Sequence, residues 1–282
     1  MSEQLANVIK YYDSTNFEYE HFWSRQSLAM HFGFYDNTVN THQESLQKMN
    51  QVLSELARIS ESDHVLDAGC GYGGSAIWLA ENIGCTVVGS NIVPYQIKKA
   101  KRFAKKSHAA DKLQFIQASY LDTGMQDTSF DIIWGLESIV HCNDKGYFLK
   151  EAFRLLRPGG RILISEYLLE PNVAVTQTEK KDVANWLKAW AMPNLLTEEE
   201  YKKYLKSAGF EKIEVFDLSE KVERSLLVCR TYAHRALQFV GILQKISLIN
   251  NISTDNTVAN YKLHDLFKRG IWRYKVIVAV KS

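Results

Sequence analysis

The chain has 282 residues, of which 46% are hydrophobic and 23% are charged, and its formal net charge is +2. These values are ordinary for a globular protein with one large domain, and so small a charge excludes a general attraction to nucleic acid or to an anionic membrane. No uninterrupted apolar run approaches the ~20 residues that cross a bilayer, so we expect neither a nucleic-acid partner nor stable membrane insertion.

The amino terminus and the cysteines predict a reducing compartment. The opening stretch MSEQLANVIKYYD has no apolar core of a secretory signal, and the four cysteines are scattered without a C-x-x-C pair. His31 and His42 have no partner at metal-ligand spacing. A cytoplasmic protein without a metal site or a disulfide framework is therefore expected.

Residues 1–60 are predicted to form a helical, aromatic-rich lid. Helical pieces outside a doubly wound sheet usually pack over the carboxyl ends of its strands, where ligands bind. Residues 219–270 are a second long helical stretch, which is expected to cover the pocket, to mediate homo-oligomer formation, or both.

Between these regions short apolar runs alternate with helical periodicity, which predicts βαβ units. One helix opens with a capping box from Thr197 to Glu200 and stops at Gly209. The pattern predicts a doubly wound, mostly parallel, seven-stranded Rossmann-like α/β sheet, formed by residues 61–218 and 271–282. The expected strands are 64–69, 85–91, 113–119, 129–138, 161–167, 211–218 and 273–282; the expected helices are 74–84, 94–107, 144–160 and 197–210.

A glycine-rich turn follows the first of these strands. Its G-x-G-x-x-G pattern (69–74) is weak evidence alone, because a tight strand-to-helix turn needs glycine for steric reasons. A nicotinamide-binding protein usually ends its second strand with an acid, whereas this chain has Ser90 and Asn91. Asp67 would repel a pyrophosphate but suits an ammonium group. The turn thus favours a nucleoside that carries an amino acid over a dinucleotide.

Four blocks of this sequence resemble the class I S-adenosylmethionine-dependent methyltransferases. VLDAGCGYGG (65–74) is similar to the family's first motif, and the later blocks resemble the branch that methylates tocopherols, sterols, isoprenoids and other natural products. The stretches YYD (11–13) and HFGFYD (31–36) resemble that branch's lid. The later blocks are TVVGSNIVPYQIKKAK (86–101), residues 115–144 and EAFRLLRPGGRILISEY (151–167).

The resemblance implies S-adenosylmethionine as the cofactor and assigns residues to its methionine end. The backbone at Gly69 and Gly71 would approach the methionine moiety. Asp67 would organise the loop or face the ammonium group. Tyr12 would reach the carboxylate from the lid.

The resemblance also assigns residues to the nucleoside end. Asn91 would lie at the ribose with Gln96 nearby, where many relatives use an acidic residue. Ser119 would lie at the adenine amine, where many relatives have Asp, with Tyr120 beside the ring.

Three residues are candidates for the chemistry. Glu137 and His141 are four positions apart, which would place them on one face of a helix. His141 is the expected general base, because an imidazole titrates near neutrality; Glu137 would be a pocket acid or a cation stabiliser. Glu166 would orient His141 or carry the proton onward. A core histidine, a cofactor-holding or capping Glu137 and a structural Glu166 remain the alternatives.

The expected function is S-adenosylmethionine-dependent methylation of a hydrophobic small molecule. It would be O- or N-methylation, or C-methylation of an isoprenoid. An NAD(P)-dependent oxidoreductase is the first alternative. Ser90 and Asn91 argue against it, as does the lack of a Tyr-x-x-x-Lys dyad at a helical position after the fourth predicted strand. A non-catalytic nucleoside-binding scaffold is the second.

Overall fold

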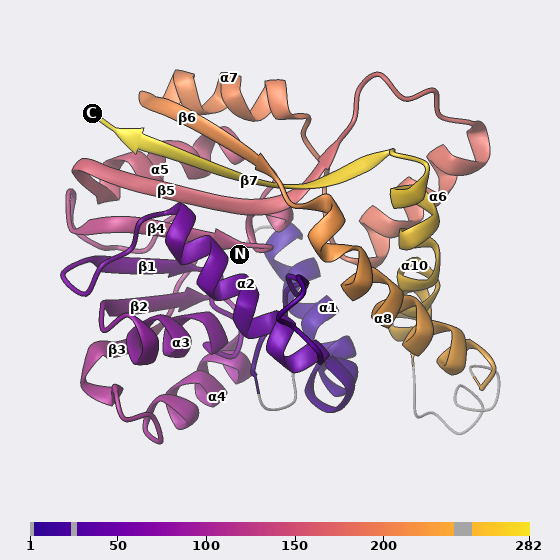
Figure 1. The fold of residues 1–282 in the computed structure, drawn as a ribbon, viewed down its shortest axis with the longest axis horizontal. Helices are drawn as coiled ribbons and strands as arrows, with labels where there is room; N and C mark the ends of the chain where they lie inside the picture. The colour runs from indigo at the N-terminus through magenta and orange to yellow at the C-terminus, as the bar shows by residue number, and fades with distance from the viewer. Residues whose placement is uncertain (1–2, 24–26, 240–249) are drawn as a thin grey trace.

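The computed structural model describes residues 3–23, 27–239 and 250–282, and a seven-stranded sheet runs through it (Figure 1). The strand order is β3-β2-β1-β4-β5-β7-β6. The first five strands pair in parallel, whereas β7 is antiparallel to both of its neighbours. The strands are β1 (His64–Ala68), β2 (Thr86–Asn91), β3 (Leu113–Gln117), β4 (Phe130–Leu136), β5 (Leu156–Leu169), β6 (Phe210–Asp217) and β7 (Trp272–Lys281). The predicted mostly parallel sheet is confirmed.

Strand β1 lies inside the sheet beside β4, and the strand order reverses between these two strands. Val65 pairs with Val87 of β2 on one side and with Ile132 of β4 on the other. All three side chains are buried, as parallel strands covered on both faces require. In open α/β sheets, ligands bind outside the carboxyl ends of the strands beside such a reversal. The carboxyl ends of β1, β2 and β4 are therefore where the fold offers a site.

Helices cover the sheet. Helix α2 contacts α3, and α5 contacts α7. Helix α7 has the predicted capping box at Thr197 and the left-handed Gly209 after its last residue. The covering helices are α2 (His42–Leu56), α3 (Gly74–Asn82), α4 (Pro94–Ala104), α5 (Lys145–Leu155) and α7 (Glu198–Ala208).

The predicted helix over 144–160 is wrong in its last five residues, 156–160. Helix α5 ends at Leu155, and β5 begins at the next residue. The register between β4 and β5 is irregular between Phe130 and Ile132, and Gly159 has a φ of +78°. Proline and a left-handed glycine are tolerated in a strand at such an irregularity. The Pro-Gly-Gly segment thus lies inside the strand.

The amino-terminal region is helical at both ends and extended between them. It contains α1 (Glu3–Glu18), a π-helical turn η1 (Tyr19–Trp23) and then α2. Residues 1–60 were predicted to be helical, and residues 27–41 within them contain no helix. We call residues 27–35 the strap. Gly33 shows how tightly it packs, because a Cβ at that position would lie 1.9 Å from Ser45 Oγ.

A helical layer precedes the last strand. Helices α8 (Ser219–Leu237) and α10 (Asn251–Lys268) pack against each other, and α10 also contacts α1 and α6 (Gln177–Ala189). The predicted insertion is helical where the structure describes it; residues 240–249 lie outside the described residues. Sequence reasoning had not identified α6. No helix in the described ranges has the length and apolar character that a membrane crossing requires.

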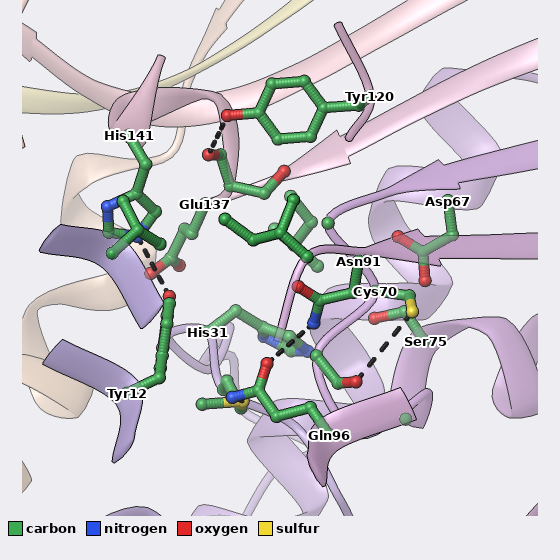
Figure 2. A pocket seen from close by; sticks show the side chains of 18 of the residues that line it. Tyr12, His31, Asp67, Cys70, Ser75, Asn91, Gln96, Tyr120, Glu137 and His141 are labelled. Carbon is green, nitrogen blue, oxygen red and sulfur yellow. Dashed lines mark hydrogen bonds between the residues drawn. The ribbon is translucent and has the colours of Figure 1, made fainter. Parts of the chain in front are cut away.

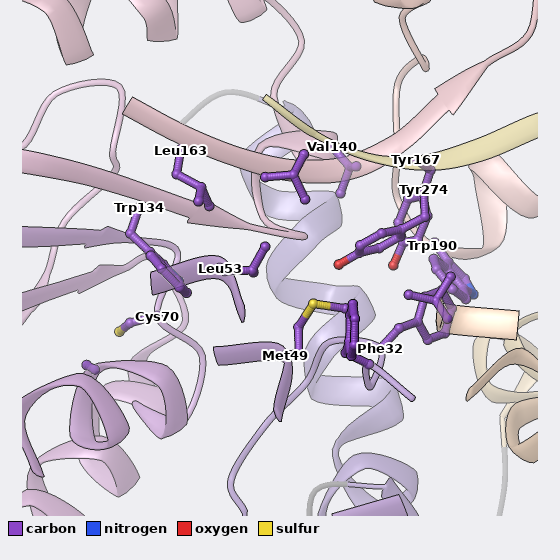
Figure 3. Close-up of a cluster of buried hydrophobic side chains, with 14 of the residues drawn as sticks. Phe32, Met49, Leu53, Cys70, Trp134, Val140, Leu163, Tyr167, Trp190 and Tyr274 are labelled. Atoms are coloured by element: carbon purple, nitrogen blue, oxygen red, sulfur yellow. The ribbon is translucent and has the colours of Figure 1, made fainter. Parts of the chain in front are cut away.

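The strap joins this layer to the main core (Figure 3). Phe32 packs edge-on against Tyr167, with ring centroids 5.6 Å apart, and its ring lies 6.2 Å from that of Tyr274. Trp186 and Trp190 of the α6 region extend the same cluster. The aromatic residues of the strap are therefore part of the hydrophobic core.

Candidate active site

A cavity that is partly open to solvent lies at the carboxyl ends of the central strands (Figure 2). Its lining includes every cofactor residue expected from the sequence, together with Glu137 and His141. Those cofactor residues are Tyr12, Asp67, Gly69, Gly71, Asn91, Gln96, Ser119 and Tyr120. Glu166 is not among the described residues that line it.

The glycine turn is held by its own packing. Gly69 and Gly71 have φ values of +90° and +53°, which a residue with a side chain adopts only with strain. A Cβ at Gly69 would lie 2.5 Å from the Cβ of Ser138, and one at Gly71 would lie 2.9 Å from Met30 Sδ. The turn therefore brings its backbone against the loop after β4 and against the strap.

Asp67 presents an unpaired carboxylate oxygen. The residue is 3% exposed, and its Oδ2 has no hydrogen-bond partner among the described residues. Burial raises the pKa of Asp67 to about 7, although the N–H of Ala76 favours the ionised form. An unpaired buried oxygen costs about 1–3 kcal/mol. A ligand with a positively charged N–H group would remove this cost.

Asn91 and Gln96 form a buried amide pair. Asn91 Nδ2 donates to Gln96 Oε1 at 2.7 Å, and Asn91 Oδ1 accepts from the N–H of Val93 at 3.3 Å. The Nε2 group of Gln96 has only long contacts, 3.6 Å to Met30 Sδ and 3.5 Å to Tyr95 Oη. Gln96 is thus a donor that a ligand hydroxyl could engage more closely.

Ser119 and Tyr120 belong to the turn after β3. Ser119 Oγ accepts from the N–H of Leu121 at 3.2 Å. Tyr120 donates to the carbonyl oxygen of Ser138 at 3.2 Å and packs edge-on against Phe148. Tyr120 therefore places a fixed ring at the edge of the cavity.

The spacing of Glu137 and His141 predicted that the two residues share a helix. They do not. Glu137 has a φ of +49°, and the residues from there to His141 include only a short 3₁₀ turn, η3 (Ile139–His141). Its carboxylate accepts from the N–H of Phe32 and the hydroxyl of Tyr274, both at 2.7 Å, and from the hydroxyl of Tyr167. Burial raises the pKa of Glu137 to about 7. The carboxylate fastens the strap to β5 and β7.

His141 has a defined tautomer. Its Nδ1 lies 3.3 Å from the carbonyl oxygen of Ala191, which can only accept, so Nδ1 carries the hydrogen. Its Nε2, 2.9 Å from the hydroxyl of Tyr12, is then the acceptor (Figure 2). Burial lowers the pKa of His141 to about 4, so the ring is neutral at pH 7.

Among the described residues, the carboxylate of Glu166 is bonded to groups other than the ring of His141. Its carboxylate accepts from the hydroxyl of Tyr201 in α7, and burial raises its pKa to about 7. The group that faces His141 Nδ1 is the carbonyl of Ala191 and not this carboxylate.

Sequence reasoning missed three contributors to the site. Ala191 fixes the tautomer of His141, Met30 contacts both Gly71 and Gln96, and His31 lines the cavity. The HFGFYD stretch was the available signal for His31 and Met30, which stand within it or beside it. No local pattern marked Ala191, because a backbone carbonyl acts there.

The chain is similar in sequence to known methyltransferases. The sequence model of a family described as a methyltransferase domain matches residues 66–164. The 27-O-demethylrifamycin SV methyltransferase of Amycolatopsis mediterranei is 29% identical over 78% of this chain and 79% of its own length. The chloroplastic tocopherol O-methyltransferase of Arabidopsis thaliana is 30% identical over 76% of this chain and 66% of its own length.

A solved structure extends the likeness of the fold to the whole chain. The geranyl diphosphate C-methyltransferase of Streptomyces coelicolor A3(2), in complex with Mg²⁺, geranyl diphosphate and S-adenosyl-L-homocysteine, superimposes with a TM-score of 0.76. It covers all of this chain and 98% of its own, at 18% identity. At that identity, the likeness speaks for the fold alone.

Proposed function

The chain belongs to the S-adenosylmethionine-dependent methyltransferases of class I, and on this premise we propose that it methylates an oxygen or nitrogen atom of a hydrophobic small molecule. The class of reaction, methyl transfer, is inferred from the relatives. The observation that carries the choice of atom is the neutral imidazole of His141, whose Nε2 accepts a hydrogen bond inside the cavity. Oxygen acceptors have a proton to lose, and this nitrogen can take it.

The residues of the cavity fit the cofactor. S-adenosylmethionine, when bound, supplies a methyl group on a positively charged sulfur. The unpaired oxygen of Asp67 would receive the ammonium group of its amino-acid end, beside Gly69 and Gly71. The residues that would hold the nucleoside are Asn91, Gln96, Ser119 and Tyr120.

The low pKa of His141 is compatible with a role as the base. An acceptor oxygen that has gained a methyl group carries positive charge, and its proton is then acidic enough to pass to a weak base. His141 Nε2 would take that proton, and the imidazolium would release it to solvent. Because the hydroxyl of Tyr12 is the partner of Nε2 in the structure, Tyr12 must give way to the acceptor or relay its proton.

Glu137 is less suited to the chemistry than His141. Its carboxylate receives three hydrogen bonds from fixed protein groups, so it acts as the anchor of the strap. The rings around it, those of Tyr167, Trp190 and Tyr274, are not among the described residues that line the cavity. A carbocation formed by C-methylation would therefore lack an aromatic wall from this cluster. The tyrosine rings that do line the cavity are those of Tyr12 and Tyr120, so the choice of oxygen or nitrogen rests on His141.

The proposal extends to the setting of the enzyme. We place it in the cytoplasm and in secondary metabolism. The rifamycin relative supports the second placement. The described cysteines, Cys70, Cys85, Cys142 and Cys229, are all free thiols, which suits a reducing compartment.

The test uses purified enzyme, a methyl-labelled donor and a panel of apolar phenols, alcohols and amines. We expect label on at least one member of the panel and, for His141→Ala, a fall in kcat of about 10²-fold or more with unchanged affinity for S-adenosylhomocysteine. Near-normal turnover by His141→Ala would reject the base, and label only on carbon would reject the choice of acceptor atom.

A further inference from the structure

His31 lies in the strap between two residues that contact opposite parts of the site. Met30, on one side, has its Sδ 3.6 Å from Gln96 Nε2, and Phe32, on the other, donates its N–H to Glu137 at 2.7 Å. Three consecutive residues span ~7 Å at most. His31 is thus held between the amide pair and the loop that carries His141, and it lines the same cavity (Figure 2).

One ring nitrogen of His31 has a hydrogen-bond partner, and the other has none among the described residues. The Nδ1 atom lies 2.8 Å from the carbonyl oxygen of Phe32, so it must carry the hydrogen. The Nε2 atom then has a lone pair, and it has no hydrogen-bond partner among the described residues although the side chain is only 4% exposed. Burial lowers the pKa of His31 to about 4, which keeps this lone pair available at neutral pH.

We propose that His31 Nε2 accepts a hydrogen bond from an O–H or N–H group of the bound ligand, as a second imidazole of the site beside His141. The inference rests on the proposed function, because it requires a ligand in this cavity. Buried acceptors are almost always paired in folded proteins, so an unpaired one that lines a cavity marks a contact that the ligand completes. His31 differs from His141, whose Nε2 already has Tyr12 as its donor.

The donor can come from either of two sources. It is a hydroxyl or amino group of the cofactor, or it is the acceptor atom at the position where the methyl group is transferred. Two known ligands separate these sources. S-adenosylhomocysteine has the ribose and amino-acid groups and no donor at the transfer position, whereas sinefungin has the same groups and an ammonium group at that position.

The experiment measures the affinity of both ligands by calorimetry for the wild type and two variants. His31→Asn retains a donor near the Nδ1 position for the carbonyl of Phe32 and deletes Nε2. His42→Asn is the matched control, because His42 Nε2 is also buried without a partner but His42 is not among the described residues that line the cavity. We expect the control to bind both ligands as the wild type does.

His31→Asn should lower the affinity for at least one of the two ligands about tenfold, which is the effect of one lost hydrogen bond. A loss for both ligands assigns the donor to the cofactor, and a loss for sinefungin alone assigns it to the transfer position. Unchanged affinities for both overturn the proposal. If the wild type binds neither ligand, the proposed function itself fails, and this inference falls with it.

A measurement on the wild type covers the case in which His31→Asn does not fold. In ¹⁵N spectra of histidine-labelled enzyme, an unprotonated imidazole nitrogen shifts upfield when it accepts a hydrogen bond. Without ligand we expect two nitrogens at the unbonded value, Nε2 of His31 and Nε2 of His42, and the spectrum of His42→Asn identifies the second. We expect the His31 signal to shift when the ligand that supplies the donor is added. If His31 shows no unbonded value without ligand, or if its signal does not move with either ligand, the proposal is contradicted.

Discussion

At the scale of single residues, Asp67 combines burial with an unsatisfied oxygen. Its pKa is raised to about 7 from an ordinary value of 3.8, so the unfolded chain loses this proton at lower pH than the folded protein does. Without ligand, the residue therefore costs stability increasingly as the pH rises from about 4 to about 7. A residue that is costly in the empty protein suits a role in binding.

Asp67→Asn should separate stability from binding. We expect a melting temperature at pH 8 at or above that of the wild type, because no charge is then buried. We expect an affinity for S-adenosylhomocysteine about 10- to 100-fold weaker, because a charge-assisted hydrogen bond contributes about 1.5–3 kcal/mol. Scanning calorimetry and titration calorimetry measure the two effects, and unchanged affinity would remove Asp67 from the site.

The same carboxyl predicts a pH dependence of binding. A carboxylate that pairs with an ammonium group must be ionised, so the affinity of the wild type for S-adenosylhomocysteine should rise from pH 6 to pH 8 and level off above the pKa of Asp67, which is about 7. Below that pKa the loss approaches tenfold per pH unit. The profile of Asp67→Asn should be nearly flat, and equal profiles for the two proteins would contradict the pairing.

What could be predicted at this scale depended on where each residue's partners lie in the chain. The residues of the glycine turn and of the strand ends were expected in one place because a parallel sheet brings its carboxyl ends to one edge. The left-handed conformation of Glu137 could not be foreseen, because it depends on distant groups such as the carbonyl of Ser165, which accepts its N–H at 2.9 Å. The predicted helical relation to His141 failed for that reason.

At the scale of elements, the strap packs directly against the backbone of the glycine turn. Gly74 has no space for a side chain because the carbonyl groups of Ser27 and Leu28 would lie 2.8 Å from its Cβ. Gly71 meets Met30 in the same way. The strap and the turn therefore form one wall of the cavity.

Gly71→Ala tests this contact. The new methyl group would displace Met30 and, with it, the contact to Gln96, so we expect about tenfold weaker binding of S-adenosylhomocysteine. Gly159→Ala is the matched control: Gly159 also has a positive φ, of +78°, but nothing lies within 4 Å of its Cβ position. Both variants should lose about 1 kcal/mol of stability from backbone strain. Equal binding by the two variants would mean that the strap does not shape the site.

Short sequence signals predicted some ends of helices and strands correctly and failed to predict others. Helix α7 begins and ends where its capping box and Gly209 predicted, because both signals act within one turn. The start of β5 was missed, since Pro-Gly-Gly is a helix terminator by itself. It lies within a strand here only because the residues on either side of it, Leu156 and Arg161, pair with β4. The extended strap was missed because its partners, such as Ser225 and Glu137, lie far along the chain.

At the scale of the whole molecule, the sheet class followed from the alternation of strands and helices. The position of the last strand could not be predicted from that alternation, because β7 enters between β5 and β6 and pairs antiparallel with both. The cavity is likewise a property of the whole fold, with walls from α1, the strap and the loops after β1, β2, β3 and β4. The identity of the acceptor depends on that composite shape, which no single motif encodes.

Binding of the cofactor should therefore reduce local unfolding in segments that lie far apart in the chain. At S-adenosylhomocysteine concentrations 100-fold above the Kd, the ligand adds about 2.7 kcal/mol of stability. We expect slower amide hydrogen exchange in α1 and in residues 27–35 as well as in the glycine turn. Protection confined to the turn would show that the amino-terminal region does not close over the ligand.

The most direct test of the central claim is a crystal structure of the protein grown with S-adenosylhomocysteine. We predict the ligand in the cavity at the carboxyl ends of β1, β2 and β4, with its ammonium group on Asp67 Oδ2 and its nucleoside beside Asn91 and Gln96. A ligand bound elsewhere, or a cavity that stays filled by the side chains of the strap, would contradict the account.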